Sequence, residues 1–348
     1  MTSRVSFNLV TWNGARYLPD LFASLENRTL KDMAIRIVDN ASDDGTMDLL
    51  RHLPNATVIR NARNLGFAAA HNQAIRLSLD KWAGEDLSRC YVIVANQDVV
   101  LTPECLERLA LSLEADRSAG SAQGKILRAF LEHPEDDYLA QTICADRVDS
   151  TGLRPSRSRR FTDRGAGELD DGQYDEPGEI FGPTGALAVY RASALESVRF
   201  EDEFFDGNFF MYREDVDLAW RLRRAGWKSL YVPSAVAYHH RGLAGSERPG
   251  IFERISNRRK KRPFLSMLST RNHHLTLIKN LGVLEAVFWS PWIGFVEGRQ
   301  MLYALFFEPT VLRGLVSGIR LWPRMLAKRR AAVKASSVGW RERSKWFS

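Results

Sequence analysis

Acidic and amide side chains follow directly on two apolar, β-branched runs of this 348-residue chain. YVIVA (91–95) leads into Asn96-Gln97-Asp98, and AIRIVD (34–39) ends on an aspartate. A carboxylate at the end of a buried strand needs a partner, because burial penalises its charge. Asp98 could therefore bind a hard divalent cation such as Mg²⁺ or Mn²⁺, or cap the next helix, although Thr102 is better placed for capping. Asp39 could accept a hydrogen bond from a pyrimidine ring N–H, or cap a turn with Asn40 and Ser42.

A second acidic pair, Glu214-Asp215, opens the helical segment EDVDLAWRLRRAGW, for which Gly226 is a plausible C-cap. Acids at a helix N-terminus often only stabilise the helix, since they complement its dipole. The aromatic run FFDGNFFMY just before the pair indicates a partly dry pocket, which would keep a carboxylate basic. Asp217 faces elsewhere on the helix and is available for helix-end electrostatics. The pair therefore allows a general base, or only helix stabilisation.

The elements that must position these groups alternate between strand and helix. VSFNLVT (5–11), AIRIVD (34–39), TVIR (57–60) and YVIVA (91–95) are separated by helical stretches, which predicts a parallel α/β sheet. Ligands of such sheets bind beyond the carboxyl ends of the strands, where three polar clusters fall: Trp12-Asn13, Asp39-Asn40 and Asn96-Gln97-Asp98. The absence of GxGxxG, GxxxxGK[ST] and GxSxG removes the main support for a dinucleotide fold, a P-loop or a serine hydrolase.

The rest of the first 250 residues is less regular. Residues 133–178 are polar and are predicted to be an irregular surface excursion or a lid over a substrate. FGPTGALAVYR (181–191) predicts a strand, and SLYVP and AVAYHH predict two further short strands before residue 241.

Taken together, these segments resemble inverting glycosyltransferases of family 2 with the GT-A fold. The resemblance covers about residues 4–246, and it is closest to bacterial rhamnosyltransferases that build lipid-linked polysaccharide. It is carried by VTWNGARYLPDLFASL, IRIVDNASDDGT, RNLGFAAAHNQAI, VIVANQDVVL and FFMYREDVDLAWRLRRAGW…YVPSAVAYHH. It implies a Rossmann-like, mostly parallel central sheet with flanking helices.

The resemblance also implies roles for individual residues. Three groups of residues match positions that bind the donor nucleotide. They are the loop after the first strand (Thr11, Trp12 and Asn13), the aspartate that reads the nucleobase and its neighbour (Asp39 and Asn40), and an NxG turn (Asn64 and Gly66). Asn96-Gln97-Asp98 occupies the position of the metal-binding DxD motif, so Asp98 is its sole carboxylate ligand. His239 matches a histidine that can complete the metal shell, and His240 points to the opposite face of a regular strand.

Two further matches concern the acceptor side. Gly185 matches backbone that lines the sugar and acceptor site, and Glu214-Asp215 matches the pair that supplies the catalytic base. We assign the base to Asp215, with Glu214 as its neighbour and the next candidate. The implied reaction is a single in-line displacement in which Mg²⁺ or Mn²⁺ holds the leaving diphosphate in a site that excludes water.

Charge divides the chain into two regions. Residues 1–250 carry 30 Lys and Arg against 37 Asp and Glu, whereas residues 251–348 carry 19 against 5, a net charge of +14. This basic region contains an NRRKKR run (257–262) and LGVLEAVFWSPWIGFV (281–296), which is too short to span a bilayer and is interrupted by Pro291. Five of the nine Trp follow residue 288. The pattern favours helices that lie in an anionic membrane interface, and the alternative is a packing module with a solvated basic face.

The sequence predicts a catalytic domain (1–250) and a basic helical region (251–348), in a protein peripheral on the inner face of the cell membrane. Three cysteines without a CxxC pair and no signal peptide favour the cytoplasm. The expected donor is dTDP-rhamnose, then UDP-galactofuranose or another UDP-sugar, and the expected acceptor is a lipid-linked glycan. A sugar-phosphate nucleotidyltransferase would need a Gly- and Lys/Arg-rich loop that Val5–Asn13 lacks. Nucleic-acid binding by the tail is disfavoured by its long apolar runs.

Overall fold

The computed structural model describes residues 4–132, 141–240 and 263–347 of the chain. Its first third forms the predicted parallel unit, in which β1 lies between β2 and β4 and β3 is the edge strand. The strands are β1 (Val5–Thr11), β2 (Ala34–Asp39), β3 (Ala56–Arg60) and β4 (Tyr91–Asn96). β1 and β4 are almost wholly buried, as expected of strands covered on both faces.

The whole sheet has ten strands and is mixed, so the expected mostly parallel sheet is corrected. Its order is β10-β12-β6-β11-β4-β1-β2-β3, with β5 paired to β12 and β7 paired to β6. β11 runs antiparallel to β4 because the chain enters it beside the carboxyl end of β4, where Leu187 pairs with Ala95. The added strands are β5 (Val99–Leu101), β6 (Ala119–Glu132), β7 (Gln141–Ser150), β10 (Gly178–Glu179), β11 (Leu187–Arg191) and β12 (Lys228–His240).

Strand β12 replaces the two short strands that the sequence predicts. It pairs along its length with β6, and a bulge between Val232 and Val236 absorbs Pro233, which cannot donate to the ladder. Gly124 faces this bulge, and a Cβ atom there would lie 1.9 Å from the carbonyl oxygen of Ala235. Close backbone approach therefore lets one strand continue through a proline.

The segment predicted to be irregular is more ordered than expected in its described part, 141–178. β7 pairs with β6, and β8 (Leu153–Pro155) pairs with β9 (Phe161–Asp163) in a small separate sheet. Residues 133–140, the start of the predicted lid, lie outside the described residues. β7 forms because β6 extends far enough to offer an edge, which the polar composition does not reveal.

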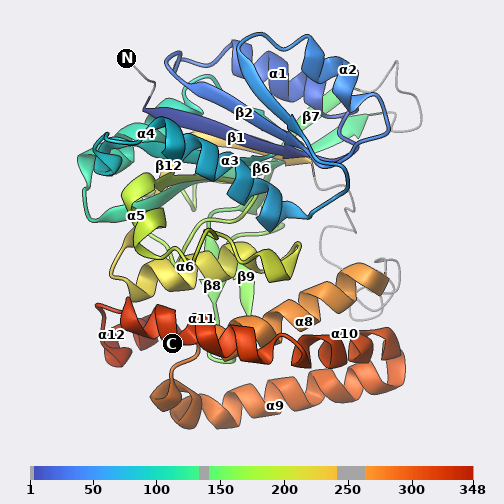
Figure 1. The fold of residues 1–348 in the computed structure, drawn as a ribbon, viewed down its shortest axis with the longest axis vertical. Helices are drawn as coiled ribbons and strands as arrows, with labels where there is room; N and C mark the ends of the chain where they lie inside the picture. Colours follow the sequence, from blue (N-terminus) through green and yellow to red (C-terminus); the bar gives the residue numbers. More distant parts are fainter. Residues whose placement is uncertain (1–3, 133–140, 241–262, 348) are drawn as a thin grey trace.

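Helices cover both faces of the sheet (Figure 1). One face packs against α1 (Leu18–Glu26), α2 (Thr46–Arg51) and α4 (Cys105–Ala115). The other face packs against α3 (Phe67–Lys81), α5 (Ala192–Ser197) and α6 (Glu214–Arg224). Short 3₁₀ turns lie at Leu87–Arg89, Gly207–Phe209 and Lys345–Phe347.

The C-terminal helices form a further layer against α6 (Figure 1). They are α8 (Pro263–Asn280), α9 (Val283–Phe307), α10 (Pro309–Ile319), α11 (Trp322–Lys334) and α12 (Trp340–Ser344). Leu275 of α8 and Met325 of α11 bury Phe209, and Phe347 packs on Trp220 of α6. The boundary predicted at residue 250 and the basic run 257–262 lie outside the described residues.

Helix α9 lies farthest from the sheet (Figure 1) and continues through Pro291, so the predicted interruption is wrong. A proline removes one backbone hydrogen bond, which an otherwise regular 25-residue helix can lose without ending. Among the helices of the described residues, none is long and apolar enough to cross a membrane.

Candidate active site

The carboxyl ends of β4, β1 and β2 lie side by side, as the sequence predicts. Val10 pairs with Asn96, and Thr11 pairs with Asp39. Gln97, between Asn96 and Asp98, binds the β1 loop: its Oε1 accepts hydrogen bonds from the Thr11 hydroxyl (2.6 Å) and the Trp12 N–H (2.9 Å). The Trp12 side chain is 48% exposed and is free to contact a ligand.

The predicted base-reading residues lie in a tightly bonded turn. Asp39 is fully buried, and its carboxylate accepts hydrogen bonds from the N–H and hydroxyl of Ser42, as expected of a residue that caps a turn. Asn13 joins the same turn, because its Oδ1 accepts the N–H of Asp43 at 3.0 Å. Asn40 donates to the carbonyl of Gly66 at 3.2 Å and thereby connects this turn to the NxG turn.

The NxG turn needs its glycine for two reasons. The φ of Gly66 is +84°, and a Cβ atom there would lie 2.4 Å from the carbonyl oxygen of Phe210. Asn64 accepts the Gly66 N–H at 2.8 Å, which fixes the start of α3. The predicted donor turn therefore abuts the loop that precedes Glu214.

Asp98 and His239 face each other, with Oδ1 and Nε2 3.2 Å apart. The other ring nitrogen, Nδ1, lies 2.9 Å from Oδ2 of buried Asp149 on β7. Burial by itself lowers the pKa of His239, but the negative charges of Asp98 and Asp149 outweigh it and raise the pKa to about 10. His240 points the other way, toward Thr142 and the Tyr17 ring, so His239 is the histidine of this pair that meets Asp98.

These groups fit a divalent cation with two protein ligands. The carboxylate of Asp98 and the imidazole of His239 are suitable donors, and a metal-bound histidine typically bonds a carboxylate through its other nitrogen, as His239 does with Asp149. Within residues 4–132, 141–240 and 263–347, no three His, Cys, Asp or Glu side chains converge as a metal site. Substrate phosphate oxygens and water would have to complete the shell.

Glu214 and Asp215 begin α6 in two different environments. Asp215 Oδ2 accepts the N–H of Gly185 (3.1 Å), and its Oδ1 accepts the N–H of Val216 (2.7 Å). Glu214 is buried, and its Oε2 has no hydrogen-bond partner among the described residues. Burial raises the pKa of Glu214 to about 8, and the neighbouring Asp215 charge adds to it. Burial also raises the pKa of Asp215, although its two backbone hydrogen bonds oppose the shift.

One backbone segment joins the two acidic centres. Gly185 donates to Asp215, and the next residue, Ala186, accepts the N–H of Asn96 at 2.9 Å. Asn96 in turn lies 3.4 Å from the His239 ring. Residues 185–186 therefore lie between Asp215 and Asn96, which contacts the Asp98–His239 pair.

The backbone just before Glu214 is strained. Phe210, Tyr212 and Arg213 have φ values of 65°, 70° and 74°, in the left-handed region that non-glycine residues avoid. Such residues cost on the order of 1–3 kcal/mol each and persist only where their surroundings determine them. Phe210, with ψ −65°, is the centre of a γ-turn in which the Met211 N–H bonds the Phe209 carbonyl at 2.8 Å.

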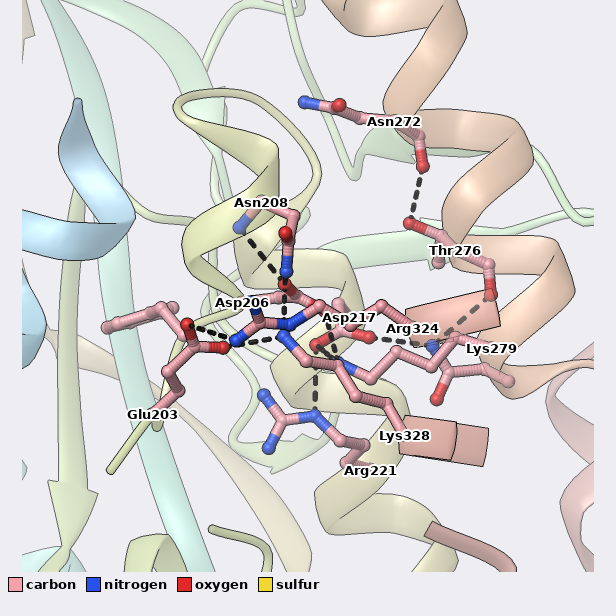
Figure 2. Close-up of polar contacts among 12 residues, drawn as sticks. Glu203, Asp206, Asn208, Asp217, Arg221, Asn272, Thr276, Lys279, Arg324 and Lys328 are labelled. Atoms are coloured by element: carbon pink, nitrogen blue, oxygen red, sulfur yellow. Dashed lines mark hydrogen bonds and ion pairs between the residues drawn. The ribbon is translucent and has the colours of Figure 1, made fainter. Parts of the chain in front are cut away.

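Asp217, two residues after Asp215, belongs to a buried ionic network that we call the lysine joint (Figure 2). Lys279 of α8 donates to Asp206 and Asp217, both at 2.9 Å, and Lys328 of α11 reaches Asp206 at 2.5 Å. Arg221 also binds Asp217, at 2.9 Å. Although burial opposes ionisation, the lysine and arginine charges hold the pKa values of Asp206 and Asp217 below the ordinary range.

Sequence reasoning missed Asp149, Gln97 and the lysine joint. Asp149 lies in the segment predicted to be irregular, so nothing marked it as a neighbour of His239. Gln97 lies within the NQD motif, but the motif does not indicate that its side chain bonds the loop after β1. Lys279 and Lys328 were counted only as basic charge, and no local pattern distinguishes a buried lysine from an exposed one.

Comparison with known proteins connects this geometry to a family. The profile described as Glycosyl transferase family 2 matches residues 6–199. An N-acetylglucosaminyl-diphospho-decaprenol L-rhamnosyltransferase of Mycobacterium tuberculosis is 30% identical over 256 residues, covering 72% of this chain and 80% of that protein. An N-acetylglucosaminyltransferase of Mesorhizobium japonicum is 25% identical over 230 residues, covering 64% of this chain and 47% of that protein.

Solved structures of low identity share the fold. S. aureus TarS in complex with UDP-GlcNAc aligns with a TM-score of 0.53 at 13% identity, over 95% of this chain and 88% of that chain. GalNAc-T7 with UDP, GalNAc and Mn²⁺ aligns with a TM-score of 0.53 at 16% identity, over 79% of this chain and 47% of that chain.

Proposed function

Because this chain belongs to glycosyl transferase family 2, we propose that it is an inverting rhamnosyltransferase that uses dTDP-rhamnose and a lipid-linked glycan acceptor. The observation that supports sugar transfer is the position of residues 185–186, which have Asp215 on one side and the Asp98–His239 pair on the other. The sugar and the lipid-linked acceptor are proposed from the relative that acts on a diphospho-decaprenol substrate.

In the proposed reaction, Asp215 accepts the proton of the acceptor hydroxyl. The acceptor oxygen forms a bond to the anomeric carbon while the bond from that carbon to the donor phosphate oxygen breaks, and the nucleoside diphosphate leaves. The raised pKa of Asp215 suits proton acceptance, because a more basic carboxylate is a better general base. Glu214 is less suited, since its side chain is only 6% exposed.

The donor would lie across the carboxyl ends of β1, β2 and β4. Trp12 offers an exposed aromatic face to the nucleobase of the donor, and Asn13, Asn40 and Asn64 stabilise the turns around that position. Asp39 would support the donor site by stabilising its turn through the hydrogen bonds from Ser42. Gly185, whose open side faces Phe67 and Asp215, would line the sugar site.

A thermal-shift panel of dTDP-rhamnose, UDP-galactofuranose and other UDP-sugars, followed by turnover with a lipid-linked acceptor, tests the donor. We expect dTDP-rhamnose to stabilise and react, and NMR of the product to reveal an inverted anomeric centre. A preference for a UDP-sugar would contradict rhamnosyl transfer but not glycosyl transfer, and retention at the anomeric carbon would contradict the single displacement.

Asp98 and His239 would hold a Mg²⁺ or Mn²⁺ ion that neutralises the charge of the leaving diphosphate. We expect Asp98→Ala to lose most activity and metal-dependent donor binding. His239→Ala should lose less, because water can replace a neutral ligand. Asp149→Asn should weaken metal affinity about 10–100-fold.

The matched control for the histidine is exposed His52→Ala, which should behave as wild type. Metal affinity is measured by titrating Mn²⁺ into the apoprotein and donor binding by calorimetry. Full activity in excess EDTA would overturn the metal proposal.

We further propose that the C-terminal helices attach the protein to the anionic inner face of the cell membrane. Leu284, Phe288, Phe295, Leu302 and Phe306 of α9 are all more than half exposed. At 3.6 residues per turn they fall within about 40° of one another, so they form one apolar stripe. The stripe lies in a region of net charge +14, and the two together favour an anionic interface.

Liposome flotation tests this attachment. Binding to anionic vesicles should weaken with salt, and each of Phe295→Ser and Phe306→Ser should reduce it about tenfold or more. Leu111→Ser is the matched control, because Leu111 is 57% exposed but lies on α4. Equal losses in all three variants, or no binding at low salt, would contradict membrane attachment through α9.

A further inference from the structure

The strained loop 209–213 has carbonyl groups that its own backbone leaves without regular partners. A segment with three left-handed residues forms neither helix nor strand, so these oxygens need donors from elsewhere. The loop ends at Arg213, the residue that precedes Glu214-Asp215. Any change in its path therefore changes the direction in which the proposed base points.

The donors come from α8, about sixty residues later in the chain. The fully buried amide of Asn272 donates from Nδ2 to the carbonyl oxygens of Phe209 (2.8 Å), Met211 (2.8 Å) and Tyr212 (2.9 Å). Arg271 adds bonds to the carbonyls of Asn208 (3.0 Å) and Phe209 (3.2 Å). One side chain thus bridges three carbonyl groups of the strained loop.

We propose that Asn272 is a positioning residue for Asp215: by holding loop 209–213 in its strained path, it aims the base at the acceptor hydroxyl. The inference rests on the proposed role of Asp215. It makes α8 part of the reaction site, in addition to any role of the C-terminal region at a membrane.

The lysine joint keeps α8 in register with the loop. Lys279, two turns after Asn272, is pinned between Asp206, which precedes the loop, and Asp217, which follows the base (Figure 2). Helix α8 is therefore fixed to both ends of the segment that contains the loop and Asp215. Because the joint is buried, α8 cannot slide without breaking the bonds of Lys279 to both carboxylates.

The far side of the loop touches the donor turn. The Phe210 carbonyl accepts the N–H of Ala68 at 3.3 Å, and Gly66 lies against the same residue. The loop therefore lies between α8 and the start of α3. An amide on α8 can therefore set the distance between the donor turn and Asp215 from the side opposite the strands.

Asn272→Ala removes the donors while leaving Asp215 intact. We expect kcat to fall about 10²-fold, the loss that a displacement of about 1 Å can cause, with donor KM changed less than about threefold. Hydrogen–deuterium exchange of amides 209–216 should accelerate. If the alanine variant does not fold, Asn272→Ser, which retains a single donor, should give intermediate exchange and kcat.

Thr276→Ala on the same helix is the matched control. Its buried hydroxyl donates only within α8, to the Asn272 carbonyl at 2.8 Å, so the variant should lose stability without affecting kcat or the exchange of 209–216. A double-mutant cycle adds a readout that a structural role would not change: Asn272→Ala should slow Asp215→Asn by less than about threefold.

The exchange measurement separates this inference from the proposed function. Unchanged exchange at 209–216 in Asn272→Ala would overturn the positioning role even in an active enzyme. Faster exchange with no transfer by the wild-type chain would contradict the function instead. The positioning role would also be overturned if the kcat losses of Asn272→Ala and Asp215→Asn multiplied fully in the double variant. Equal kcat losses in Asn272→Ala and Thr276→Ala would overturn it as well.

Discussion

Helix α6 carries two kinds of buried carboxylate within one turn. Asp215 accepts hydrogen bonds from two backbone N–H groups, Oε2 of Glu214 has no hydrogen-bond partner among the described residues, and burial raises both of their pKa values. Asp217, two residues on, meets Lys279 and Arg221, and its pKa is lowered. Burial raises the pKa of all three carboxyl groups, and Arg213 only partly offsets it at Glu214 and Asp215, so the close lysine and arginine partners of Asp217 decide the direction of its shift.

This difference separates two uses of a buried charge. A buried carboxylate without a direct ion pair keeps its affinity for a proton and can act as a base. A carboxylate with lysine partners is fixed in its ionised form and holds elements together. The proposed base and the lysine joint are thus adjacent on one helix but perform opposite tasks, and substitution can test each of them separately.

The largest expected effect is on the base. Asp215→Asn should fold and bind donor nearly as wild type, while transfer falls about 10²–10⁴-fold, because a general base contributes that factor. Turnover is measured at saturating donor, with calorimetry for donor affinity. If more than about a tenth of wild-type turnover remains, Asp215 is not the base, and Glu214→Gln becomes the next variant to assay.

Breaking the joint should affect stability first. Lys279→Met keeps the length of the side chain but leaves Asp206 and Asp217 short of a buried cation, so we expect a loss of about 3–5 kcal/mol in the free energy of unfolding. Urea denaturation measures it. Arg51→Ala, which breaks an exposed pair with Asp48, should cost less than about 1 kcal/mol. Equal costs would remove the distinction between the joint and a surface pair.

The smallest effect is a dependence of stability on pH. The pKa of Glu214 is about 8 in the folded protein against an ordinary 4.5, so between these values the folded chain retains a proton that the unfolded chain releases. The contribution of Glu214 to the free energy of unfolding therefore falls as the pH rises from about 4.5 to about 8. Between pH 5 and pH 8, the free energy of unfolding of Glu214→Gln should therefore rise by about 1 kcal/mol or more relative to that of the wild type. Urea denaturation at each pH measures it.

Asp217→Asn should behave in the opposite way. Because its folded pKa is lowered, ionised Asp217 stabilises the protein above its ordinary pKa of 3.8, and that stabilisation is lost as the pH falls. The stability gap between wild type and Asp217→Asn should therefore close toward acid pH. Parallel pH trends in the two variants would contradict the comparison.

Local patterns predicted the elements that contain most of the site. The alternation of apolar runs and helical segments gave β1, β2 and β4, and the polar residues after them lie at one edge, as parallel strands require. The pair Glu214-Asp215 begins a helix, and the adjacent His239 and His240 rings lie on opposite sides of β12. Each of these follows from spacing within a few residues, where backbone geometry is nearly the same in every protein.

What only the tertiary structure decided is which distant groups meet. β11 reverses beside β4, β7 brings Asp149 to His239, and α8 brings Asn272 to loop 209–213. The sequence by itself determined β1, β2, β4, the helix that Glu214-Asp215 begins, and the type of side chain at the ends of those strands. It left open whether a lysine in the basic tail faces solvent or Asp217, because burial is a property of the assembled layers, and burial together with the charges it brings close sets each carboxylate's pKa.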